Sequence, residues 1–552
     1  MKSADSPDYV VGVAGCGAMG QGIAQVSVQG GMKTVLFDAR EGGAEAAKTA
    51  IAGRLNRLVE KGRMGEADAQ AAIDLLVPAS GMADMAQVDC VVEAVFEDLD
   101  VKHALFKELE SVVRPDCTLA SNTSSIPLAQ IARVCEHRER VAGLHFFNPV
   151  PLMKLVEVIR PIGVSDEVIA NLMELGRRMT RTPVEVKDSP GFLVNMGGRA
   201  YTTEALRIVH EGIATPEQVD AIMRDCWGFR MGPFELMDLT GIDVNYPVSQ
   251  IIYDGYNQDP RLKTSPNHKA MYDAGLFGRK TGQGWYKYDE TGQKVDPPSP
   301  DFVADADPAR EVAIVGYLEP EIAFDEDGEI IEDVDIHTSD ALSAILEKGR
   351  SAVDEDAGAD PDIAQLVDLC REAGIDVIPD NGECPVLSAP LGEDAADASV
   401  FGFSENLHRR LVCIDLLGDT SSRLTLMAPT GADPANLRAV ASALSRSGRR
   451  ITAIKDGHGF VGPRMVAMIA NLGCYMAEIG LASPEDIDTA MQLGLNYPRG
   501  SIEFVEALGD GEASVCVLIL EALHEATGDD RYRPTLWLKR RAMLGLPIHT
   551  PN

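Results

Sequence analysis

The fold is decided by the stretch Tyr9-Val-Val-Gly-Val-Ala-Gly-Cys-Gly-Ala-Met-Gly20. Residues 9–14 form an apolar run that is typical of a buried strand, and residues 21–29 carry apolar side chains at helical spacing. A second apolar run, Thr34 to Phe37, ends at Asp38. A strand, a glycine-rich turn, a helix and a second strand with a terminal acid together form the dinucleotide-binding fingerprint of a Rossmann-type α/β domain.

The residues of the turn have separate roles in that fingerprint. Gly15 permits the tight turn, Gly17 lets a pyrophosphate approach the backbone, and Gly20 lets the helix pack closely on the strand. Ala18 and Met19 begin the helix, whose positive end would face the phosphates. The alternative interpretation is a glycine-rich loop in an α/β domain without a ligand.

The acid after the second strand indicates which dinucleotide binds. Asp38 can accept hydrogen bonds from the adenosine ribose and would repel a 2′-phosphate, so the sequence favours NAD. Arg40 lies two residues further on and leaves NADP as the less favoured alternative.

Length and composition bound the class of protein. The chain has 552 residues and a formal net charge of −35, so we expect three or four domains and no non-specific binding to nucleic acid or anionic membranes. The amino terminus has no apolar signal core, and the sequence contains no run of about 18 apolar residues that could span a membrane. The ten cysteines form no CxxC pair. We therefore expect a cytoplasmic protein without zinc or disulfides.

One acidic stretch, Phe324-Asp-Glu-Asp-Gly-Glu329, invites comparison with a calcium loop. If Gly328 were the sixth loop position, the first and twelfth would be Ala323 and Val334, which cannot ligate. We interpret the stretch as a solvated surface segment and expect no metal site.

An internal repeat predicts the domain organisation. Residues 186–192 resemble residues 454–460 at an offset of 268, and the offset holds over some fifty residues. It also relates Gly212 to Gly480, Pro216 to Pro484, Asp220 to Asp488, Gly232 to Gly500 and Glu235 to Glu503. Each copy has an amphipathic pattern that predicts a small helical domain, and two copies can bury their apolar faces against each other as an internal pseudo-dimer. Association of whole chains into a homo-oligomer is left open.

The segment between the copies resembles a weakened α/β unit. Residues 310–316 predict a strand with no glycine loop after it, and residues 384–389 resemble residues 90–94. We therefore predict a Rossmann-type NAD-binding domain (1–185), an all-helical domain (186–290), a degenerate α/β module with an acidic linker (291–450) and a second helical copy (451–552).

Polar side chains gather where the predicted strands of the first domain end. Ser124 follows one strand, and His145 and Asn148 lie at the end of another. Ligands of parallel sheets bind beyond the carboxyl ends of the strands. A histidine there can act as a base, and Glu157 on the next strand can orient it. The alternative is a structural histidine and an ordinary ion-paired acid.

Seven motifs follow one another in a specific order along the chain. They are Gly15-Cys-Gly-Ala-Met-Gly20, Val92-Glu-Ala-Val-Phe-Glu97, Ser121-Asn-Thr-Ser-Ser125, His145-Phe-Phe-Asn-Pro-Val-Pro151, Lys154-Leu-Val-Glu-Val158, Pro190-Gly-Phe-Leu-Val-Asn195 and Met231-Gly-Pro-Phe-Glu-Leu-Met-Asp238. The ordered set resembles the 3-hydroxyacyl-CoA dehydrogenase family over residues 8–288, and the second helical copy adds residues 454–510. The duplicated layout is similar to bacterial 3-hydroxybutyryl- and 3-hydroxyadipyl-CoA dehydrogenases.

The resemblance implies an activity and its residues. It implies NAD-dependent, reversible oxidation of a (3S)-3-hydroxyacyl-CoA to the 3-oxoacyl-CoA, with an acyl-CoA as partner. His145 would be the general base and Glu157 its carboxylate partner. Ser124 and Asn195 would hold the 3-oxygen and the thioester carbonyl.

Further positions match family residues around the nicotinamide cofactor. They are Glu97, Lys102, Ser124, Asn148 and Lys280. For the two lysines, the alternative is a solvated surface cation.

The second half departs from the active pattern. At the offset of 268, the base, its partner and the substrate asparagine are replaced by Cys413, Thr425 and Pro463. We expect this half to be inert, with His458 as a structural residue. Two alternative functions stay open: a dehydrogenase of a free hydroxy acid or sugar acid, and a non-catalytic NAD-binding scaffold.

Overall fold

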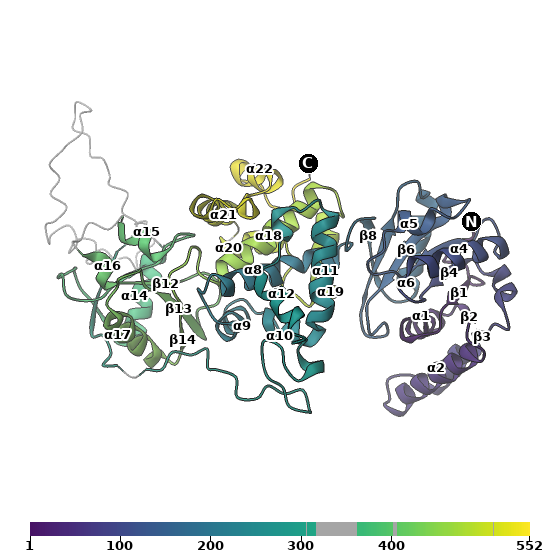
Figure 1. Cartoon of the computed structure of the whole chain (residues 1–552), viewed down its shortest axis with the longest axis horizontal. Coiled ribbons are helices and arrows are strands. Elements are labelled where there is room, and N and C mark those ends of the chain that lie inside the picture. The colour runs from purple at the N-terminus through teal and green to yellow at the C-terminus, as the bar shows by residue number, and fades with distance from the viewer. Residues whose placement is uncertain (305, 316–360, 401–405, 510, 512, 552) are drawn as a thin grey trace.

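The computed structural model describes residues 1–304, 306–315, 361–400, 406–509, 511 and 513–551. Two α/β units lie at opposite ends of the molecule, and the helical copies lie between them (Figure 1). The acidic stretch at residues 324–329 lies outside the described residues. None of the described helices is both long and apolar enough to span a membrane.

The first unit is built on an eight-stranded sheet. Its strand order is β3-β2-β1-β4-β5-β6-β7-β8, and all neighbours are parallel except β6 and β7. The strands are β1 (Val10–Ala14), β2 (Lys33–Phe37), β3 (Leu76–Pro78), β4 (Cys90–Glu93), β5 (Thr118–Ser121), β6 (Val141–Phe146), β7 (Leu155–Arg160) and β8 (Thr182–Lys187). The helices are α1 (Ala18–Gln29), α2 (Gly43–Glu60), α3 (Glu66–Asp74), α4 (Leu99–Val112), α5 (Leu128–Ala132) and α6 (Asp166–Arg178). The predicted Rossmann-type unit is confirmed.

The helical copies share their local chemistry. The first contains α7 (Val194–Gly197), α8 (Arg199–His210), α9 (Pro216–Asp225), α10 (Pro233–Thr240), α11 (Ile242–Gly255) and α12 (Pro266–Asp273). The second contains α18 (Gly462–Glu478), α19 (Pro484–Leu495), α20 (Glu503–Leu508), α21 (Ala513–Thr527) and α22 (Leu536–Leu544). The hydroxyls of Thr215 and Ser483 cap α9 and α19, each from the position directly before a Pro-Glu pair.

The repeated aspartate and glycine make the same contact in each helical copy. Asp220 accepts a hydrogen bond from the backbone N–H of Phe234 at 2.9 Å, and Asp488 accepts the equivalent bond from Ile502 at 2.7 Å. A Cβ at Gly232 or Gly500 would overlap the aspartate of its own copy. The close approach of helix and carboxylate therefore explains why both residues recur at the same offset.

The second α/β unit carries a six-stranded sheet of order β10-β9-β11-β12-β13-β14. Its strands are β9 (Glu311–Ile314), β10 (Asp376–Val377), β11 (Val386–Ser388), β12 (Leu411–Asp415), β13 (Arg423–Met427) and β14 (Arg450–Ala453). Its helices are α14 (Pro361–Ala373), α15 (Ala395–Val400), α16 (Leu407–Arg410) and α17 (Pro434–Leu444). The single antiparallel pair, β12–β13, corresponds to β6–β7, so the degenerate α/β module is confirmed.

The strand register corrects one assignment in this module. His145 is paired with Glu157 across β6 and β7, whereas Thr425 is paired with Asp415 and not with Cys413. Twelve positions separate the first pair and ten separate the second, because the connection between the strands is two residues shorter. The structural counterpart of His145 is therefore Asp415, and the prediction of Cys413 from a constant offset was wrong.

The two halves exchange equivalent contacts. The backbone N–H of Lys187, at the end of β8, donates to the carbonyl of Leu481 in the second helical copy at 2.9 Å. Lys455, just after β14, donates in the same way to Ile213 of the first copy, also at 2.9 Å. Both members of the second bond are related to the first by the offset of 268, so each α/β unit is attached to the helical copy of the other half.

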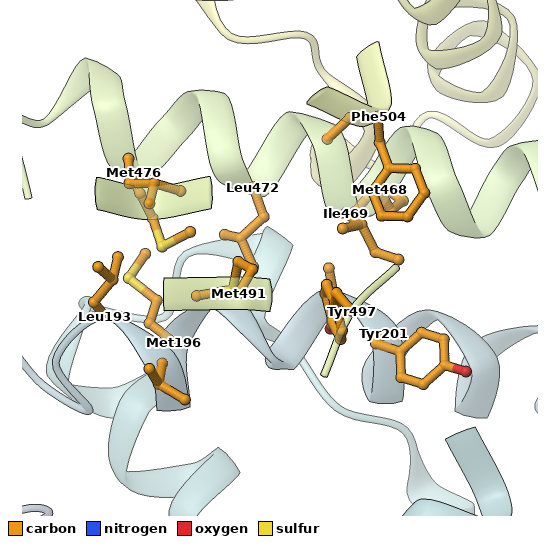
Figure 2. Packing of buried hydrophobic residues seen from close by; sticks show 14 of the residues in the cluster. Leu193, Met196, Tyr201, Met468, Ile469, Leu472, Met476, Met491, Tyr497 and Phe504 are labelled. Atoms are coloured by element: carbon orange, nitrogen blue, oxygen red, sulfur yellow. The ribbon is translucent and has the colours of Figure 1, made fainter. Parts of the chain in front are cut away.

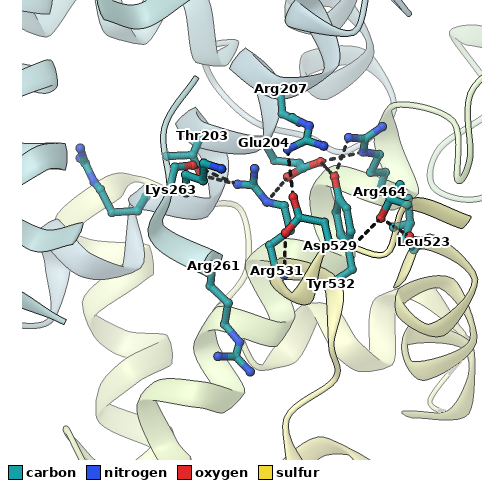
Figure 3. Close-up of polar contacts among 12 residues, drawn as sticks. Thr203, Glu204, Arg207, Arg261, Lys263, Arg464, Leu523, Asp529, Arg531 and Tyr532 are labelled. Carbon is teal, nitrogen blue, oxygen red and sulfur yellow. Dashed lines mark hydrogen bonds and ion pairs between the residues drawn. The ribbon is translucent and has the colours of Figure 1, made fainter. Parts of the chain in front are cut away.

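A buried charged network joins the helical copies. Glu204 of α8 lies among Arg464, Arg531 and Tyr532 of the second copy (Figure 3). Its Oε1 accepts from Arg464 Nε at 2.6 Å and from the Tyr532 hydroxyl at 2.8 Å, and its Oε2 lies 3.3 Å from Arg531 Nε. Charges this deeply buried are stable only when they are paired, so the network requires both copies in place.

Candidate active site

The glycine-rich turn leaves an open face at the start of α1. Gly15 has a φ of +100°, which an L side chain rarely adopts, and a Cβ on Gly20 would overlap the Gly15 carbonyl oxygen. A Cβ on Gly17 would meet no described atom within 4 Å. Among the described residues no side chain caps α1, which begins at Ala18, so its first N–H groups are left to a ligand. These observations fit a dinucleotide pyrophosphate.

Asp38 lies directly beside the glycine-rich turn. Its carboxylate accepts from the backbone N–H of Cys16 at 2.9 Å and from Arg40 Nε at 2.9 Å. The Arg40 side-chain hydrogen bond is the main cause that lowers the pKa of Asp38 to about 2, so the acid is ionised. Because the Arg40 guanidinium binds Asp38, the pair does not offer a free cation to a 2′-phosphate.

Lys102 belongs to a buried ion-pair network and is not a solvated cation. Its Nζ lies 2.7 Å from Glu93 Oε1 and 3.3 Å from Glu97 Oε2. Glu97 in turn accepts from the Thr123 hydroxyl at 2.6 Å and from the Ser124 backbone N–H at 2.9 Å. Burial opposes ionisation of Glu97, but the Thr123 hydrogen bond and the Lys102 charge outweigh it and lower its pKa to about 2. The network fixes the loop that carries Ser124.

His145 and Glu157 lie directly opposite each other on β6 and β7. His145 Nδ1 is 2.6 Å from Glu157 Oε2, and both side chains are buried. Glu157 Oε1 accepts from the backbone N–H groups of Leu193 at 3.1 Å and Val194 at 2.8 Å. An ionised carboxylate only accepts hydrogen bonds, so with Glu157 ionised the contact requires a proton on Nδ1, and the neutral imidazole then presents its lone pair at Nε2.

Aromatic rings and an amide hold the histidine in place. The ring centroid of Phe147 is 4.5 Å from that of His145, and the ring of Phe192 is 5.8 Å away. Asn122 Oδ1 accepts from the backbone N–H of Phe146 at 2.8 Å and so ties the end of β5 to the end of β6. The imidazole is therefore fixed by packing as well as by Glu157.

The remaining predicted residues are described by their own contacts and exposure. Asn195 Nδ2 is 3.5 Å from the Ser124 carbonyl oxygen, so the helical copy meets the loop after β5 there. Asn148 is exposed just after β6. Lys280 Nζ lies 2.5 Å from Asp243 Oδ1, within the first helical copy.

Sequence reasoning missed the groups that hold the site residues. The amides of Leu193 and Val194, the carboxylate of Glu93 and the amide of Asn122 were not assigned roles. Glu93 and Asn122 lie inside two of the seven ordered motifs, and that position was the sequence signal that could have pointed to them. Backbone amides give no such sequence signal, because every residue type except proline supplies an N–H.

A dinucleotide-binding glycine-rich turn and a buried histidine–carboxylate pair on strands of one sheet define a nucleotide-dependent dehydrogenase. Residues 10–189 match the family profile described as "3-hydroxyacyl-CoA dehydrogenase, NAD binding domain". Residues 191–288 and residues 459–547 each match the profile "3-hydroxyacyl-CoA dehydrogenase, C-terminal domain". The chain belongs to the 3-hydroxyacyl-CoA dehydrogenase family, and its cofactor is NAD.

Individual relatives agree with this assignment. The chain is 34% identical over 539 residues to the 3-hydroxyadipyl-CoA dehydrogenase of Escherichia coli K12, covering 97% of each chain. It is 39% identical over 277 residues to a probable 3-hydroxybutyryl-CoA dehydrogenase of Deinococcus radiodurans, covering 50% of this chain and 99% of the relative. The crystal structure of a 3-hydroxybutyryl-CoA dehydrogenase from Escherichia coli K12 matches with a TM-score of 0.77 and 31% identity, over 97% of this chain and 98% of that one.

Proposed function

We propose that His145 is the general base of a reversible, NAD-dependent oxidation of (3S)-3-hydroxyacyl-CoA to 3-oxoacyl-CoA, and that Glu157 orients it. The observation that carries the proposal is the 2.6 Å contact between His145 Nδ1 and Glu157 Oε2. Bound NAD supplies the acceptor for the hydride that leaves C3. His145 Nε2 takes the hydroxyl proton, and the Glu157 carboxylate stabilises the resulting imidazolium. In the reverse direction His145 returns the proton.

Ser124 and Asn195 are proposed to hold the substrate. The proposal is supported by the 3.5 Å contact between Asn195 Nδ2 and the Ser124 backbone carbonyl, which joins the helical copy to the loop after β5. A hydroxyl and an amide there can donate hydrogen bonds to the 3-oxygen and the thioester carbonyl. Glu97, Lys102, Asn148 and Lys280 are proposed around the cofactor, and for Glu97 and Lys102 their buried network with the Ser124 loop supports this.

The chain is proposed to act as an internal pseudo-dimer in which only the first half is catalytic. The paired hydrogen bonds of Lys187 and Lys455 support that arrangement. Domain boundaries near residues 185, 290 and 450 are part of the same proposal. We infer a cytoplasmic location, since all ten cysteines are free and buried.

Oxidation of NADH by the intact chain tests the substrate class. The substrates are acetoacetyl-CoA, longer 3-oxoacyl-CoAs, 3-oxoadipyl-CoA and the matching free acids. We expect turnover with at least one thioester and none with the free acids. Turnover confined to free acids would favour a hydroxy-acid dehydrogenase, and tight NADH binding without any turnover would favour a scaffold.

A Glu157→Gln variant tests the proposed orienting carboxylate. We expect kcat to fall by about 10²-fold or more with NADH binding unchanged, since a neutral amide does not stabilise an imidazolium. A variant with wild-type kcat would contradict the role of Glu157.

A further inference from the structure

A helix of the second half lies against the first-half site. α19 packs on α7, β7 and β8, although its own half lacks the base and the glycine-rich loop. α7 begins at Val194, whose backbone N–H donates to Glu157 at 2.8 Å. Helix α19 is therefore separated from the His145–Glu157 pair by one layer of side chains.

The contact between α19 and this layer is unusually close. A Cβ on Gly494 would lie 2.9 Å from Leu155 Cδ2 and 2.9 Å from Val194 Cγ2. Leu155 lies two residues before Glu157 on the same strand, and Val194 is one of its amide donors. A Cβ on Gly494 would thus crowd one side chain on the strand of Glu157 and one on the residue whose amide binds Glu157.

A methionine makes the second contact of α19 with α7. A Cβ on Gly197 would overlap the sulfur of Met491. Met491 lies among Leu193 and Met196 of the first half and Met476 of the second (Figure 2). The short helix that holds Glu157 is packed tightly between its own half and the other.

Glycine is a poor residue for position 494 on local grounds. Gly494 lies inside α19, where alanine would favour the helix. Local stability therefore does not account for the glycine, whereas the approach of Leu155 and Val194 does.

We propose that the second half, through Gly494 and Met491, positions the active site of the first. The close packing holds the Val194 amide against Glu157 and thereby keeps the carboxylate aligned with His145. Gly494 and Met491 are positioning residues and touch neither substrate nor cofactor. The inference rests on the proposed function of His145 and Glu157, and it gives the inert half a role in turnover.

The test compares Gly494→Ala with the matched variant Gly473→Ala in the intact chain. A Cβ on Gly473 would lie 2.7 Å from Ser501 Cβ, so it crowds the second copy alone. We expect Gly494→Ala to lower kcat by about tenfold with unchanged NADH affinity, since displacements near 1 Å have effects of this order or larger. Gly473→Ala should keep its kcat at temperatures where it is folded. Adding Val194→Ala to Gly494→Ala removes two of the three methyl groups that the new Cβ would meet, leaving Leu155 Cδ2, and should restore part of the kcat.

The positioning role is overturned if Gly494→Ala keeps wild-type kcat, or if Val194→Ala brings no recovery. It is also overturned if Gly473→Ala lowers kcat equally at the same thermal stability. Failure of the underlying function has a different signature: His145→Gln would then turn over normally, whatever Gly494→Ala does.

Discussion

Asp415, the structural counterpart of His145, should make the stability of the second α/β unit depend on pH. Its side chain is buried, and its carboxylate accepts from the backbone N–H of Leu417 at 3.0 Å. Among the described residues, no cation offsets this burial, and the Leu417 backbone hydrogen bond is the interaction that opposes it. Burial raises the pKa of Asp415 to about 7. The nearby Cys226 thiol stays neutral, since burial raises its pKa to about 12.

The direction of the change in stability with pH follows from proton binding in the folded and unfolded states. Between pH 4 and pH 7 the folded chain keeps a proton on Asp415 that the unfolded chain has lost, so this residue makes the folded state less stable as the pH rises. Above pH 7 its unfavourable contribution is complete. A pKa of about 7 against an ordinary 3.8 corresponds to a contribution of up to about 4 kcal/mol.

Asp415→Asn, which cannot ionise, should therefore unfold at higher denaturant than the wild type at pH 8. The measurement is urea unfolding at pH 5 and pH 8, followed by near-ultraviolet signals, with the exposed Asp376→Asn as the control. We expect the advantage of Asp415→Asn to be larger at pH 8 than at pH 5, and none for Asp376→Asn. An advantage independent of pH, or a loss of stability at pH 8, would refute the reasoning.

Two further substitutions test the ion pair of Lys102 with Glu93 and the cap that Asp188 gives to α5. Lys102→Met leaves Glu93 buried without its cation and should lower the free energy of unfolding by about 3–5 kcal/mol, measured by urea denaturation; a loss below about 1 kcal/mol, typical of exposed pairs, would contradict the buried pairing. Asp188 accepts from the backbone N–H groups of Leu128 at 2.9 Å and Ala129 at 2.8 Å at the start of α5. Asp188→Ala should cost about 1–2 kcal/mol by the same measurement, as the loss of a helix cap does, and an unchanged midpoint would argue against that cap.

The sequence predicted the features that depend on local pattern. The glycine-rich turn, β1, α1 and β2 were predicted because an apolar run, three glycines and a terminal acid follow one another within thirty residues. The duplicated aspartate and glycine pairs were found because one offset relates them. The structure adds their reason, which is the hydrogen bond of Asp220 and Asp488 to the following helix.

Features that depend on distant contacts were not predictable. The offset failed at β12 because the connection between β12 and β13 is two residues shorter than the one between β6 and β7, whereas β13 and β14 keep the offset. Only the strand register reveals Asp415 opposite Thr425. The amides that hold Glu157 and the approach of Gly494 to Val194 join segments far apart in sequence. No local sequence pattern predicts contacts of this kind.

The most direct test of the account compares turnover and cofactor binding in one variant, His145→Gln. NADH binding is measured by fluorescence titration, and turnover by NADH oxidation with the best 3-oxoacyl-CoA. The account predicts wild-type NADH affinity with a kcat lower by about 10²–10⁴-fold, the usual contribution of a general acid–base group. A His145→Gln variant that binds NADH and turns over at the wild-type rate would contradict it.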